Sequence, residues 1–108
     1  MSRTPPTSRC VALLRAFDKT NPDMQGAIDT AATAIENTIS APAMADLNEG
    51  QFAALIDLYI WKGADWFAAS NILAWVENGN LTLPVPALAV LGNRGIAERD
   101  MWNLGNSE

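Results

Sequence analysis

Asp29 and Glu36 are the carboxylate pair whose spacing could serve acid–base chemistry, because glycosidases need only two carboxylic acids. The two residues lie seven positions apart in a segment with helical periodicity, which places both on one polar face. Such a row of acids is typical of the solvated face of a helix. We therefore expect no catalytic residue among the carboxylates.

Histidine is absent from the 108 residues, and Cys10 is the only cysteine. The sequence therefore lacks the side chain most used for proton transfer near neutral pH and the commonest metal ligand. One thiol excludes an internal disulfide and a Cys-rich zinc site, and its place on an apolar stripe predicts a small buried hydrophobe. No stretch has the dense acidic pattern of an EF-hand. We expect no metal, no cofactor and no enzymatic activity.

Gly92-Asn93-Arg94-Gly95 is a glycine turn that carries one base and could hold an anion. A nucleotide phosphate loop requires further glycines or a GK[ST] ending between a strand and a helix, and neither pattern is present. The sequence therefore predicts a turn without a ligand.

Large apolar residues that lie off the main helical stripes are the most informative feature. Leu58 and Trp61 lie away from the stripe of one predicted helix, and Phe67 and Trp75 lie away from that of the next. Either terminal helices cover this helical hairpin on both sides, or the residues form an exposed anchor patch, since Trp is enriched at binding hot spots. With the neighbouring acids, the candidate partner-binding residues are Asp57, Leu58, Trp61, Asp65, Phe67, Trp75 and Glu77.

Helical periodicity predicts an all-α fold, a single small helical bundle of four to six helices. The predicted helices cover residues 8–20, 22–39, 47–62, 66–77, 86–91 and 96–104. Asn21 is expected to cap the second helix, and Asp46 and Glu49 match a capping box before the third. Two prolines predict an extended connector over residues 80–86.

The expected domain organisation is simple. Residues 1–7 form a flexible basic arm, residues 8–104 a single helical domain, and residues 105–108 a frayed tail. Hydrophobic residues make up 49% of the chain, which is enough for a core. The sequence predicts neither a signal peptide nor a transmembrane segment, and we expect a cytoplasmic protein without membrane contact.

Charge is distributed unevenly along the chain, which has a net charge of -5. Residues 20–93 contain eight acids and one base, Lys62, whereas residues 1–19 contain four bases and one acid. The absence of any base between Lys62 and Arg94 argues against a helix-turn-helix that binds double-stranded DNA. We expect instead a protein-binding module, an inhibitor or regulator that docks on a basic, nucleic-acid-binding surface of a partner protein.

Small phage proteins that block bacterial defence, anti-CRISPR proteins among them, have this general size and charge. The analogy rests on size and charge and not on a motif, and it would place a phage or mobile-element protein in the host cytoplasm. Two alternatives remain at this point. One is an assembly subunit that forms homo-oligomers through its Trp-rich hairpin, and the other is a carrier of a small apolar ligand.

Overall fold

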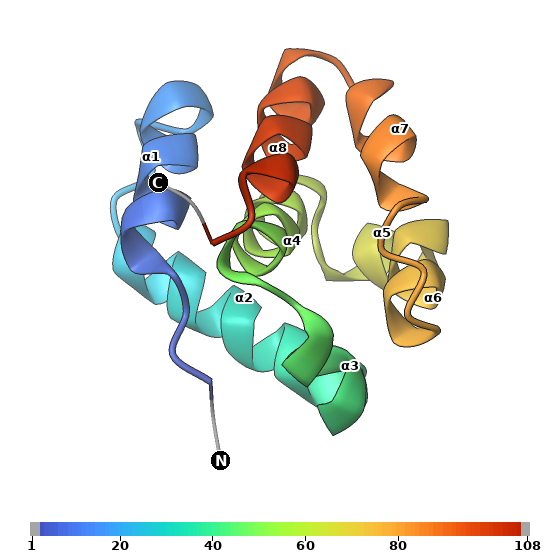
Figure 1. The fold of residues 1–108 in the computed structure, drawn as a ribbon. Coiled ribbons are helices and arrows are strands. Elements are labelled where there is room, and N and C mark those ends of the chain that lie inside the picture. Colours follow the sequence, from blue (N-terminus) through green and yellow to red (C-terminus); the bar gives the residue numbers. More distant parts are fainter. Residues whose placement is uncertain (1–2, 107–108) are drawn as a thin grey trace.

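The computed structural model describes residues 3–106, and that range folds into eight helices and no strand (Figure 1). The helices are α1 (Thr7–Phe17), α2 (Met24–Thr38), α3 (Ala41–Asp46), α4 (Glu49–Lys62), α5 (Ala64–Ala69), α6 (Asn71–Glu77), α7 (Pro84–Ala89) and α8 (Asn93–Leu104). The predicted all-α bundle is confirmed, with eight helices in place of four to six.

Helix α4 is the centre of the bundle. Helices α1, α2, α5 and α8 all pack against it, as Figure 1 shows. Its residues from Phe52 to Leu58 are buried without interruption, including positions on the side that helical periodicity assigned to the surface. A helix covered from several directions shows little amphipathic pattern. Of the two interpretations of the hairpin, the covered one therefore holds for Leu58, whereas Trp61 is half-buried.

The start of α2 differs from the prediction by two residues. Asp23 is the N-cap, and its carboxylate accepts a hydrogen bond from the amide of Gly26 at 2.9 Å. Asn21 accepts a hydrogen bond from the amide of Asp23 at 3.0 Å and so orders the turn before the cap. A carboxylate at this end is favoured by the helix dipole as well as by the free amides.

An unpredicted short helix, α3, displaces the predicted capping box. Ser40 caps α3, and a proline in its first turn starts the helix where the sequence had suggested only a stop. Because α3 continues to Asp46, this residue cannot cap α4. The capping box is formed instead by Asn48 and Gln51, whose side chains accept reciprocal hydrogen bonds of 2.8 and 2.9 Å from each other's amides.

The predicted helix over residues 66–77 is broken at Ser70. This residue has extended backbone angles (φ -77°, ψ 149°), ends α5, and accepts a hydrogen bond from the amide of Leu73 at 3.3 Å to begin α6. A side chain that can cap offers the backbone an alternative to helix continuation. The break turns α6 away from the direction of α5 (Figure 1).

The predicted extended connector is shorter than expected, because Pro84 begins α7. Proline suits the first turn of a helix, where its missing amide is not needed. The segment between α6 and α7 is held by Trp102, whose indole nitrogen donates to the carbonyl of Leu81 at 3.0 Å. Gly92, with a φ of 99°, turns the chain so that α8 begins at Asn93 rather than Ile96.

The terminal predictions fall partly outside residues 3–106. The arm over residues 1–7 stays a prediction, although Arg3 donates to the Met44 carbonyl at 2.8 Å and forms a 3.2 Å ion pair with Glu49. The tail over 105–108 also stays a prediction, and the Gly105 carbonyl accepts a hydrogen bond from the amide of Gly50 at 2.9 Å. No helix in the described range has the length and apolar character needed to cross a bilayer.

Candidate functional site

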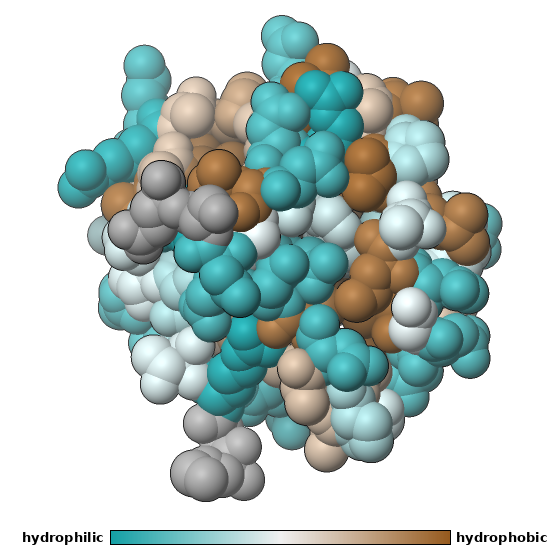
Figure 2. Space-filling model, viewed as in Figure 1, coloured by the Kyte–Doolittle hydropathy of each residue, from teal (hydrophilic) through white to brown (hydrophobic). Residues whose placement is uncertain are grey.

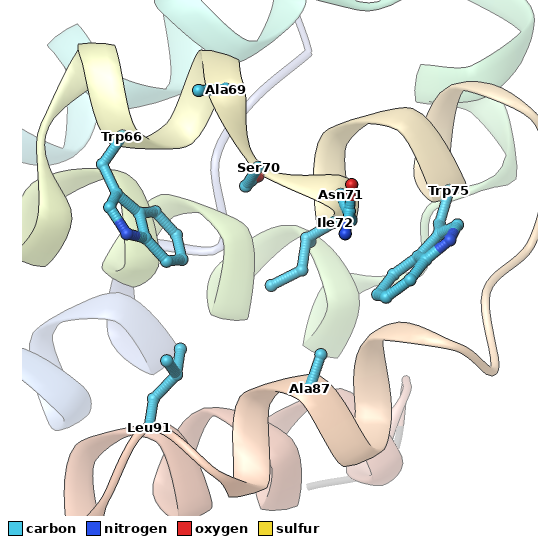
Figure 3. Close-up of a pocket in the computed structure, with 8 residues that line it drawn as sticks. All are labelled: Trp66, Ala69, Ser70, Asn71, Ile72, Trp75, Ala87 and Leu91. Carbon is cyan, nitrogen blue, oxygen red and sulfur yellow. The ribbon is translucent and has the colours of Figure 1, made fainter.

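A groove of about 360 Å³ lies between the α5–α6 segment and α7 (Figure 3). Its lining residues are Trp66, Ala69, Ser70, Asn71, Ile72, Trp75, Ala87 and Leu91. In Figure 3 the indole rings of Trp66 and Trp75 stand on either side of Ile72 and extend toward α7, which supplies the opposite wall. The groove is thus open and mainly apolar, with Ser70 and Asn71 as its polar members and an aromatic ring at each end.

The break at Ser70 creates this groove. Trp66 belongs to α5 and Trp75 to α6, and the change of direction between the two helices separates their rings. Helix α7 packs against α6 from the other side. The Ser70 hydroxyl donates to the Phe67 carbonyl at 2.8 Å, which fixes the corner. The walls are therefore held by backbone geometry and not by the side chains alone.

The segment that carries the groove is acidic. Residues 63–93 contain Asp65 and Glu77 and no lysine or arginine. Both acids are exposed, and the Glu77 carboxylate accepts a hydrogen bond from the amide of Ser40 at 2.9 Å. In the right half of Figure 2, where α5 to α7 lie, hydrophobic residues form a band between hydrophilic ones. The groove segment thus carries two exposed acids, Asp65 and Glu77, and the ammonium of Lys62 lies 5.4 Å from the ring centroid of the groove residue Trp66.

Three of the predicted partner-binding residues are not on the surface. Leu58 and Phe67 are 0% and 2% exposed, because α4 is covered on several sides and Phe67 packs edge-on against Tyr59 with ring centroids 5.5 Å apart. Asp57 has no exposed surface either. The prediction of a contact surface is wrong for these three residues. Trp61 and Trp75 are half-buried, and Asp65 and Glu77 are exposed.

Trp66 is the groove residue that the sequence pattern misassigned. In one continuous helix over 66–77, Trp66 would share the apolar core stripe with Ile72 and Val76. The break at Ser70 rotates α6 relative to α5, so Ile72 and Val76 are buried while Trp66 is 37% exposed. The serine was the one available signal, because Ser caps helices well and lowers helix propensity inside them.

Asp57 is held inside the protein by Arg94, at the start of α8. The guanidinium donates from Nε to Oδ2 at 3.0 Å and from Nη2 to Oδ1 at 2.8 Å, a bidentate ion pair. Arg94, the basic residue of the Gly92–Gly95 turn, therefore binds the carboxylate of Asp57 in the same chain and not an external anion. Burial alone lowers the pKa of Arg94, but the hydrogen bonds and the charge of Asp57 outweigh it and raise that pKa.

Glu98, one turn after Arg94, completes a buried cluster with the ion pair. Its carboxyl group has no exposed surface, and in the described range neither of its oxygens has a hydrogen-bond partner. Burial, together with the proximity and negative charge of Asp57, raises the pKa of Glu98 to about 11. The carboxyl group of Glu98 is therefore neutral near pH 7. Since both carboxyl groups are sealed from solvent, no substrate reaches them.

Lys62 and two indoles form a second cluster beside the groove. The Lys62 ammonium lies 4.3 Å from the centroid of the Trp61 ring and 5.4 Å from that of the Trp66 ring. The Arg94 guanidinium lies 5.5 Å from the Trp61 ring. All three distances fall within the range of cation–π attraction. Trp66 therefore belongs both to the groove and to this cation site.

Comparisons with protein-family models, with characterised proteins and with solved structures give no match to this chain. Within residues 3–106, no three side chains of the metal-binding types come together.

Proposed function

We propose that this chain is a non-enzymatic, acidic binding module that docks on the basic, nucleic-acid-binding surface of a partner protein and so inhibits or regulates it. The observation that carries the proposal is the apolar groove between Trp66 and Trp75, which lies in a segment of 31 residues, 63–93, without a base. The acidic segment would take positions that nucleic-acid phosphates otherwise occupy on the partner.

The groove and the charge contribute differently to such an interaction. Opposite charges speed the encounter of two proteins, whereas a buried apolar anchor slows their dissociation. Trp residues are enriched among the positions that carry most of the binding energy. Val90, which follows α7 next to the groove residue Leu91, is 82% exposed and extends the apolar contact area. We therefore expect the partner to offer an apolar side chain flanked by lysine or arginine.

Charge disfavours a second copy of this chain as the occupant. A two-fold dimer places the same patch of each copy against the other, which would bring Asp65 and Glu77 toward their like-charged equivalents. A small apolar ligand is also a weaker candidate. Ligand sites enclose most of the ligand surface, whereas this groove is bordered by Trp66, 37% exposed, and by exposed Asn71.

A random peptide library displayed on phage, selected on the immobilised protein, tests the proposal. We expect selected peptides to combine an apolar residue with neighbouring lysine or arginine, and to bind at least about tenfold more weakly at 500 mM than at 50 mM salt. Enrichment of acidic or uncharged peptides would contradict the electrostatic part.

Two matched variants locate the binding site of the selected peptides. Ala69→Arg places a long cation in the groove, and Ala12→Arg places the same charge on an exposed position of α1. Peptides should lose binding to the first variant and keep it for the second. Equal binding to both would refute the groove as the site, and a dimer in sedimentation velocity that Ala69→Arg dissociates would favour the second copy instead.

A further inference from the structure

The cation site at the junction of α4 and α5 has an unusual composition. Lys62 ends α4, and Gly63, with a φ of 89°, turns the chain so that α5 brings Trp66 back over the Lys62 ammonium. Trp61 covers the same ammonium from the preceding position. Two indoles from consecutive helices thus enclose one alkylammonium group.

Within the described part of the chain, no carboxylate forms an ion pair with Lys62. The ion pairs found among residues 3–106 are Arg3–Glu49, Arg94–Asp57 and Arg99–Asp100, and Lys62 has no further hydrogen bond or ion pair. It is therefore held by the two aromatic faces and by the carbonyl end of α4, where the helix dipole favours a cation. Each of these is a weak attraction at a partly exposed site, and the flexible lysine stem can swing away.

We propose that Trp61 and Trp66 form a binding site for the ammonium group of a lysine side chain on the partner, which replaces the ammonium of Lys62. The chain's own lysine shows which chemical group the site accepts, at 4.3 and 5.4 Å from the ring centroids. Arg94 does not oppose a cation there, because its charge is paired with Asp57 at 2.8 Å.

The position of the site connects it to the groove. Trp66 is shared by both, so a lysine in the cation site lies next to an apolar side chain in the groove. Asp65, which precedes Trp66 in the chain, is an exposed acid. The assignment of this lysine to a partner protein rests on the proposed function. The existence of the cation site does not depend on that function.

The test uses a small probe on the whole protein. The probe is Nα-acetyl-lysine methylamide, its Nε-trimethyl form is a second probe, and Nα-acetyl-norleucine methylamide is the uncharged control. The four indole N–H signals of the chain are followed by NMR, after assignment with single Trp→Phe variants. Trp75 and Trp102 serve as internal references, because neither indole lies near Lys62 in the cation–π contacts of the structure.

Lys62→Met removes the internal competitor, and Lys19→Met, at an exposed position, makes the same change in charge. We expect the charged probes to shift the Trp61 and Trp66 signals, and to bind Lys62→Met at least about fivefold more tightly than Lys19→Met. Trp66→Ala added to Lys62→Met should abolish the effect. If Lys62→Met does not fold, Lys62→Gln replaces it, and we expect the same tighter binding of the charged probes.

Three results would overturn the cation site: no gain for Lys62→Met over Lys19→Met, equal binding of the norleucine probe, or shifts confined to Trp75 and Trp102. If the indole signals shift as expected while the peptide selection fails, the cation site stands and the proposed function falls. If selected peptides bind the groove but replacing their lysines with norleucine leaves affinity unchanged, the assignment of the ammonium to the partner is refuted.

Discussion

Arg94 and Asp57 form a bidentate ion pair, with donor–acceptor distances of 3.0 and 2.8 Å, between the first turn of α8 and the middle of the central helix α4. The Asp57 side chain has no exposed surface and that of Arg94 is 10% exposed. A buried charge that has one partner depends on it, because water cannot take the partner's place. The pair therefore ties α8 to α4 at a specific register.

Arg94→Met should lower the free energy of unfolding by about 3–5 kcal/mol, since it leaves Asp57 charged and unpaired inside the protein. Urea denaturation followed by far-UV circular dichroism measures the loss. The double variant Asp57→Leu, Arg94→Met should recover part of it, because no buried charge is left. Arg99→Met is the matched control. Its pair with Asp100 is largely exposed, so its effect should stay below about 1 kcal/mol.

Glu98→Gln should make the protein more stable at neutral and alkaline pH. The pKa of Glu98 is raised to about 11 in the folded state, so the folded protein binds a proton that the unfolded chain releases near its ordinary value. The stabilisation from this group is complete below that ordinary value and is lost as the pH rises toward 11. The amide of glutamine has nearly the same shape and does not titrate.

The measurement for Glu98 is the free energy of unfolding from pH 5.5 to 9. The advantage of Glu98→Gln over the natural protein should grow by up to about 1.4 kcal/mol per pH unit. Glu77→Gln, at an exposed position, should show no such growth. A constant difference between Glu98→Gln and the natural protein across this range would mean that Glu98 is ionised in the folded state.

Cys10 should be unreactive while the protein is folded. Its thiol is fully buried, and burial, with smaller contributions from the charges of Asp57 and Glu49, raises its pKa to about 12. Only the thiolate reacts, and almost none forms at pH 8. Labelling with a disulfide reagent should therefore be at least about 1000-fold slower than in 8 M urea. A native rate within tenfold of the denatured rate would contradict this burial.

The helical class could be predicted from periodicity because most helices here keep one apolar stripe, as α2 does with Ile28, Ala32 and Ile35 buried. The central helix could not be placed in this way. Its partners come from both ends of the chain, and only their packing decides that Leu58 and Asp57 lie inside. Off-stripe apolar residues indicate that a helix is covered on more than one side, but they do not show which segments cover it.

The groove could be predicted even less. Trp75 was identified as off-stripe, but the groove depends on the break at Ser70 and on α7, and both arise from local capping and turn chemistry. Likewise, Glu98 carries no sequence signal of burial, because an acid within a charged stretch resembles a solvated residue. Its burial follows from α8 lying between α4 and α7.

Gly50 sits where α4 and the end of α8 come together. A Cβ atom at this position would lie 2.1 Å from the carbonyl oxygen of Met101 and 2.8 Å from the amide nitrogen of Gly105. Real atoms do not approach so closely, and backbone cannot move aside as a flexible side chain does. The Gly50 amide also donates to the Gly105 carbonyl at 2.9 Å, so the contact fixes the C-terminal end of α8 on α4.

Gly50→Ala should therefore destabilise the protein by at least about 2 kcal/mol, although alanine favours a helix over glycine by about 1 kcal/mol. Gly26→Ala is the matched control, because the added methyl group would meet the side chain of Asp23, which can rotate. The stability lost in Gly26→Ala should stay near that of one helix cap, about 1 kcal/mol. Thermal unfolding of both variants, followed by circular dichroism, measures the difference. If Gly50→Ala were as stable as the natural protein, α4 and α8 would not be in the close contact described, and the register set by Arg94 and Asp57 would have to change with it.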